Sequence, residues 1–99
     1  MSNFSNETLL GKNAIITGGA GLLGPRHGLA LARAGANVTL VDISDENLII
    51  AKKKILEIDK NFKIETYNLD ITNLNEVEKF EKNFNSTQNY FSILINNAA

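Results

Sequence analysis

Four short apolar runs separated by three helix-like segments constrain the fold of this chain more than any other feature. The runs are rich in β-branched residues and cover residues 13–17, 37–42, 62–69 and 91–95. Strands joined through helical segments of a dozen or so residues must run parallel, because a tight hairpin cannot connect them. The sequence therefore predicts an α/β fold in which strands and helices alternate as βαβαβαβ.

Capping residues mark the ends of the three expected helices. Gly35 is a stop signal for a first helix over residues 22–34, and Pro25 falls in its first turn, where its missing N–H would have no intrahelical partner. Ser44 is an N-cap for the second helix, and Asn73 and Glu76 have capping-box spacing ahead of the third. The side chains expected to face the core are Leu48, Ala51, Ile55 and Ile58 in the second helix and Leu74, Val77, Phe80 and Phe84 in the third.

Length and charge limit what else the chain can be. The 99 residues allow one modest domain, which we place at residues 11–99 after an N-terminal tail at residues 1–10. A net charge of −1 does not favour binding to nucleic acid or to an anionic membrane, and the sequence has no cysteine, no signal-like N-terminus and no membrane-length apolar run. We therefore expect a cytoplasmic protein without a metal site, in which the single histidine, His27, is a surface or packing residue.

The segment Gly19-Ala-Gly21-Leu-Leu-Gly24 has the pattern G-x-G-x-x-G between an expected strand and an expected helix. In that context Gly18 and Gly21 let the backbone turn sharply and approach a diphosphate closely, while Gly24 lets the helix pack against the sheet. The helix N-terminus offers N–H groups to the anion. This predicts a Rossmann-type dinucleotide site, and the alternative is a glycine-rich turn without a ligand.

Asp42 ends the second apolar run, eighteen positions after Gly24. This is close to the spacing at which an acidic side chain accepts hydrogen bonds from the ribose of adenosine. Its charge would repel the 2′-phosphate of NADP, and neither Ile43 nor Ser44 supplies an arginine to bind one, so the sequence favours NAD. Alternatively, Asp42 helps to cap the following helix, and the two roles are compatible.

Right-handed crossovers define the expected layers. If the chain runs outward from the first strand to the third and then reverses to place the fourth beside the first, the strand order is 3-2-1-4. Two helices then cover one face and the third covers the other, which gives three layers around an incomplete sheet.

Together, Thr17–Gly24, Asp42, Asp70-Ile-Thr72 and Asn96-Asn-Ala-Ala99 resemble the short-chain dehydrogenase/reductase family over almost the whole chain. The resemblance implies that Asp70 and Ile71 line the adenine pocket and that Asn97, Ala98 and Ala99 pass beside the cofactor's ribose. Alternatively, Asp70 is a turn or capping residue, and Asn96 and Asn97 are structural amides. The expected cofactor-binding residues are Gly18, Gly21, Leu22, Leu23, Gly24, Asp42, Ile43, Asp70, Ile71, Asn97, Ala98 and Ala99.

The glycine loop departs from the single-domain branch of that family, which has glycine where this chain has Leu22. Gly21 instead suits the extended branch, so a nucleotide-sugar epimerase or dehydratase is an alternative. A non-catalytic nucleotide-binding module is a third interpretation. The Asn96–Ala99 motif favours the single-domain branch.

The resemblance also implies catalysis by a tyrosine, a lysine four residues later and a nearby serine. Ile71 lies four residues after Tyr67 and Leu94 four after Tyr90, so these 99 residues contain no Tyr-x-x-x-Lys and no expected catalytic residue. We therefore interpret the chain as the front part of a longer, homo-oligomeric enzyme that transfers hydride between nicotinamide and an alcohol or carbonyl carbon. The isolated chain is expected to be inactive.

Overall fold

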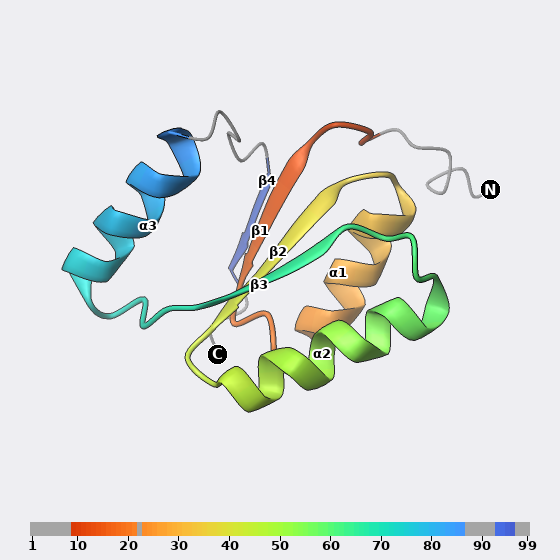
Figure 1. Cartoon of the computed structure of the whole chain (residues 1–99), viewed down its shortest axis with the longest axis horizontal. Coiled ribbons are helices and arrows are strands. Elements are labelled where there is room, and N and C mark those ends of the chain that lie inside the picture. Colours follow the sequence, from red (N-terminus) through yellow and green to blue (C-terminus); the bar gives the residue numbers. More distant parts are fainter. Residues whose placement is uncertain (1–8, 22, 87–92, 97–99) are drawn as a thin grey trace.

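The computed structural model describes residues 9–21, 23–86 and 93–96, within which strands and helices alternate (Figure 1). The strands are parallel and lie in the order β3-β2-β1-β4. The parallel α/β class predicted from the sequence is confirmed. The elements are β1 (Asn13–Thr17), α1 (Gly24–Arg33), β2 (Asn37–Asp42), α2 (Asp45–Ile58), β3 (Ile64–Asn68), α3 (Leu74–Ser86) and β4 (Ile93–Asn96).

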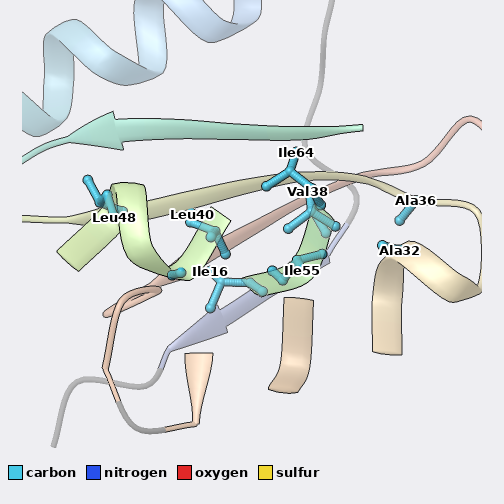
Figure 2. Packing of buried hydrophobic residues seen from close by; sticks show 10 residues of the cluster. Ile16, Ala32, Ala36, Val38, Leu40, Leu48, Ile55 and Ile64 are labelled. Carbon is cyan, nitrogen blue, oxygen red and sulfur yellow. The ribbon is translucent and has the colours of Figure 1, made fainter. Parts of the chain in front are cut away.

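Alternate residues of the central strands supply two separate cores. Ala14 and Ile16 of β1 pack on the side of α1 and α2, together with Val38 and Leu40 of β2 (Figure 2). Ile15 packs on the other side, with Phe80 of α3 and Val41 of β2. This alternation follows from the two-residue period of a strand, and it requires a strand that is apolar on both faces. Helices α1 and α2 therefore cover one face of the sheet and α3 the other (Figure 1).

Helix α1 ends at a glycine, as predicted. Gly35 has φ of 100°, its N–H donates to the Ala32 carbonyl at 2.9 Å, and the N–H of Ala36 donates to the Leu31 carbonyl at 3.0 Å. This pair of bonds is a Schellman motif, which satisfies carbonyls that the helix end would leave unpaired. The helix begins at Gly24 instead of residue 22, because Leu23 is already the N-cap.

Helix α2 begins at the predicted cap, since the Ser44 hydroxyl oxygen accepts a hydrogen bond from the N–H of Asn47 at 3.1 Å. Leu48, Ala51 and Ile55 are buried as predicted. The prediction for Ile58 is wrong, because its side chain is 54% exposed. Ile58 is the last residue of α2 and lies at the rim of a surface recess, beyond the part of the helix that faces the sheet.

Helix α3 also begins at the predicted cap. The Asn73 Oδ1 accepts from the N–H of Glu76, and the Asn73 Nδ2 donates to the Glu76 Oε2, each at 3.2 Å. Phe80 is buried and Val77 packs beside it, but the prediction for Leu74 is wrong, because its side chain is 70% exposed. Contact with the sheet begins one turn later, at Val77. The side chain of Phe84 lies outside the described residues.

The two outer strands differ from their predicted bounds. β3 is shorter than predicted at both ends, although Leu69 just beyond it is buried. β4 begins at Ile93, and residues 91–92 lie outside those the structure describes. Among the described residues, no helix has the length and apolarity needed to cross a membrane.

Candidate functional site

The carboxyl ends of the parallel strands meet at one edge of the sheet. Thr17 pairs in register with Val41 and with Asn96, and Asp42 pairs with Asn68. The loop after β1 therefore lies beside the ends of β2 and β4, and the end of β3 lies next to that of β2. The strand order reverses at β1, and in open α/β sheets ligands bind at the carboxyl edge of such a reversal.

The loop after β1 turns back over β2. Gly18 has φ of 66°, a left-handed conformation that glycine adopts without steric cost. The N–H of Gly21 then donates to the Gly18 carbonyl at 2.9 Å, and the N–H of Gly19 donates to the Val41 carbonyl at 2.9 Å. The predicted sharp turn is therefore present, and it is tied to the neighbouring strand.

Two glycines of this loop are packed against backbone. A Cβ at Gly19 would lie 2.8 Å from the Leu40 Cβ and 2.9 Å from the Ile16 carbonyl oxygen. A Cβ at Gly24 would overlap the backbone of Gly19. We predicted that Gly24 allows α1 to pack against the sheet, whereas its closest contact is with the loop itself. Gly28, one turn later, makes the approach to the sheet and α2, because a Cβ there would lie 3.0 Å from the Ile55 Cδ1.

The N-terminus of α1 faces this loop without a side-chain cap. Leu23 makes no capping hydrogen bond, the first turn holds no acidic residue, and Pro25 occupies its start. The positive end of the helix dipole is therefore not neutralised by a side chain, which favours an anion at this place. His27 is half-buried in the same helix, and its Nδ1 is buried with no hydrogen-bond partner among the described residues.

Asp42 connects the glycine loop to the turn that follows β2. Its Oδ2 accepts a hydrogen bond from the N–H of Ala20 at 3.1 Å. Its Oδ1 accepts from the N–H groups of Ile43 at 2.8 Å and Ser44 at 3.3 Å. The carboxylate thus fixes the loop relative to the end of β2, while Oδ2 keeps capacity for a further donor. The contact with Ala20, 22 positions away, could not be inferred from sequence spacing.

Asp70 forms a turn after β3. Its Oδ1 accepts hydrogen bonds from the Thr72 hydroxyl at 2.6 Å and from the Thr72 N–H at 2.9 Å. The hydroxyl bond and then the backbone bond lower the pKa of the Asp70 carboxyl, so it is ionised at neutral pH. The turn role considered for Asp70 is therefore present in the structure.

Apolar side chains lie exposed at the same edge: Leu23 is 49%, Ile43 64% and Ile71 43% exposed. Each belongs to a different loop, after β1, β2 and β3. Exposed aliphatic side chains of this kind offer surface for a flat apolar ring. Four of the predicted site residues lie outside those the structure describes: Leu22, Asn97, Ala98 and Ala99. The others lie at this edge, either in the last residue of β2 or in the segments that follow β1, β2 and β3: Asp42, Gly18, Gly21, Leu23, Gly24, Ile43, Asp70 and Ile71.

A recess of about 680 Å³ lies at the opposite edge of the sheet. It is lined by the residues that end α1 and α2, including Gly35 and Asp59. Helix C-termini carry the negative end of the dipole and Asp59 adds a carboxylate, while Arg33 and Lys63 also line the recess, so it carries charges of both signs. The carboxyl edge is the better candidate for an anionic ligand, because the uncapped N-terminus of α1 lies there.

Comparison with known proteins bears on the class of this site. The sequence matches the short chain dehydrogenase family over residues 12–99. This chain belongs to the short-chain dehydrogenase/reductase family. The short chain dehydrogenase/reductase dpfgG of Gibberella zeae is 38% identical over 92 residues, which make up 93% of this chain and 33% of that protein.

Solved structures of the family share the fold. NAD⁺-bound xylitol dehydrogenase superposes with a TM-score of 0.80 at 28% identity, over 91% of this chain and 34% of its own. The C-domain of a bacterial malonyl-CoA reductase with NADP also gives 0.80 at 28% identity, over 98% of this chain and 16% of its own. Family members therefore use either cofactor. The chain spans 26–35% of the length of the curated relatives it matches.

Proposed function

We propose that this short-chain dehydrogenase/reductase chain binds NAD at the carboxyl edge of its sheet. The observation that carries the proposal is the hydrogen bond from the Ala20 N–H to the Asp42 carboxylate. It joins a loop suited to a diphosphate directly to an acceptor suited to a ribose.

Each segment of the edge has a part in this binding. Gly18, Gly21, Leu22, Leu23 and Gly24 hold the diphosphate at the open N-terminus of α1. Asp42 accepts from the adenosine ribose through the remaining capacity of Oδ2, while Ile43, Asp70 and Ile71 border the adenine. By family resemblance, Asn97, Ala98 and Ala99 pass beside the cofactor's ribose.

We further propose a preference for NAD over NADP. A 2′-phosphate on the ribose would come against the Asp42 carboxylate, and like charges at that distance repel. The two residues that follow, Ile43 and Ser44, carry no positive charge to offset this repulsion.

The chemistry belongs to the nicotinamide, which gives or takes a hydride at an alcohol or carbonyl carbon when it is bound. The 99 residues bind and orient that cofactor but contain no Tyr-x-x-x-Lys for the accompanying proton transfer. We therefore expect these residues alone to bind NADH without turnover.

The test is a fluorescence titration of the protein with NADH and with NADPH. Asp42→Asn keeps an acceptor for the turn but removes the charge, so we expect NADH binding to weaken about tenfold or more and the preference over NADPH to shrink. Asp59→Asn is the matched control, because Asp59 also accepts a backbone N–H, from Asn61 at 2.9 Å, but at the opposite edge. Absence of NADH binding, or a preference that Asp42→Asn leaves unchanged, would refute the proposal.

A further inference from the structure

The turn between β2 and α2 is held by a side chain from the neighbouring strand. Asn68, the last residue of β3, pairs in register with Asp42. Its Nδ2 donates to the Ile43 carbonyl oxygen at 2.8 Å and to the Asp45 Oδ1 at 3.0 Å. The amide group thus contacts two of the three residues that follow Asp42.

The same turn is held from its other side by Asp42. The Asp42 Oδ1 accepts the N–H groups of Ile43 and Ser44, and the N–H of Leu69 donates to the Asp42 carbonyl at 2.9 Å. Burial contributes little here, because Ile43 and Asn68 are exposed. A segment with little buried apolar contact opens at a low free-energy cost, so the loss of its hydrogen bonds changes its conformation easily. The bonds from Asn68 are therefore a main restraint on Ile43.

We propose that Asn68 is a positioning residue for the adenosine end of the cofactor. It acts through the turn, by keeping the Asp42 carboxylate and the Ile43 side chain where the ribose and adenine meet them. This inference rests on the proposed NAD site. It assigns a role in cofactor recognition to a residue of β3 whose side-chain hydrogen bonds go to the turn after β2.

The chemistry of an amide suits this role. An asparagine donates to a carbonyl and a carboxylate without adding charge. A lysine or arginine could make the same bonds, but its positive charge at the turn would attract the 2′-phosphate of NADP. Asn68 therefore holds the turn without weakening the discrimination that Asp42 provides. Asp45, the first residue of α2, places its carboxylate at the positive end of the helix dipole.

Isothermal titration calorimetry measures the affinity of the protein for ADP-ribose and for the analogue that lacks the 2′-hydroxyl of the adenosine ribose. The ratio of the two affinities reports the ribose contact, and a uniform loss of stability would leave it unchanged. We expect the wild-type protein to prefer ADP-ribose about tenfold, and Asn68→Ala to reduce that ratio about threefold or more. Asn61→Ala, an exposed asparagine in the turn before β3, is the matched control and should keep the wild-type ratio.

A second variant separates the two bonds and does not depend on the first variant folding. Asn68→Asp combined with Asp45→Asn exchanges donor and acceptor, which restores a bond between positions 68 and 45 but leaves the Ile43 carbonyl without its donor. If the turn acts through Ile43, this variant shows the reduced ratio of Asn68→Ala. A wild-type ratio in the double variant would overturn the role of the bond between Asn68 and the Ile43 carbonyl.

The outcomes distinguish this inference from the proposed function. If Asp42→Asn abolishes the ribose preference while Asn68→Ala leaves it intact, the NAD site stands and the role of Asn68 is overturned. If the wild-type protein does not bind ADP-ribose, or binds both ligands equally, the proposed site itself fails and the inference fails with it.

Discussion

Replacing Gly24 by alanine tests whether the glycine loop and the start of α1 form one close-packed unit. A Cβ at this position would lie within 3 Å of three backbone atoms of Gly19. Backbone cannot move aside as a flexible side chain can, so either the loop or the first turn of the helix must shift. The loop is tied to β2 through the Gly19 N–H and through Ala20 and Asp42, and a shift would strain these bonds as well.

The size of the effect follows from two opposing contributions. Alanine in place of glycine stabilises a helix by up to about 1 kcal/mol, and less than that in the first turn. Overpacking a rigid contact costs about 1–3 kcal/mol, and a contact with backbone belongs at the upper end of that range. We therefore expect Gly24→Ala to lower the free energy of unfolding by about 1–2 kcal/mol. With a urea m-value of about 1–2 kcal/mol/M, the midpoint falls by about 1 M.

Urea denaturation followed by circular dichroism measures this change, and titration with NADH measures its effect on the proposed site. Gly21→Ala is the matched control within the same loop. Gly21 is exposed, and a Cβ there would meet the Gly18 carbonyl oxygen at 3.2 Å, which a small adjustment relieves. We expect its midpoint to move by much less than that of Gly24→Ala. Equal midpoints for Gly24→Ala and the wild type would refute the reasoning.

Four further predictions concern the frame around the site. Ile55→Ala removes a fully buried side chain and should lower the free energy of unfolding, measured by urea denaturation, by about 2–4 kcal/mol. Ile50 is exposed, so Ile50→Ala should change the same free energy by no more than about 0.5 kcal/mol. Similar losses for the two variants would contradict the assigned faces of α2. Ser44→Ala removes the cap acceptor of the Asn47 N–H and should cost about 1 kcal/mol, while Ser44→Asp should retain most of it. Thr72→Ala should raise the pKa of Asp70 in an NMR titration, because the hydroxyl bond that lowers it most is lost. The pKa of Asp70 is lower in the folded than in the unfolded protein, so the ionised carboxylate stabilises the fold above about pH 4. This stabilisation disappears as the pH falls through the lowered pKa. A free energy of unfolding that does not change with pH in that range would contradict the prediction.

Local chemistry explains why much of the fold was predictable from the sequence. The strands β1 and β2 have the bounds expected from their β-branched runs, because strands apolar on both faces contrast sharply with the turns around them. Gly35, Ser44 and Asn73 act at their predicted helix ends, since each cap depends on residues at most five positions apart.

Contacts between distant segments could not be predicted. Ala20 and Asp42 are joined across 22 positions, and Asn68 and Ile43 across 25, through the pairing of neighbouring strands. Spacing along the chain does not report such contacts. The exposure of Ile58 was missed for a related reason, because helical periodicity predicts a face but not where along the helix the sheet ends.

Amide chemical-shift mapping of the protein during titration with NAD tests the central claim most directly. We predict saturable shifts at the carboxyl edge, at Ala20, Gly21 and Ile43, and none at Gly35 and Asn61 of the opposite recess. Shifts confined to the recess, or no shifts with saturating NAD, would contradict it.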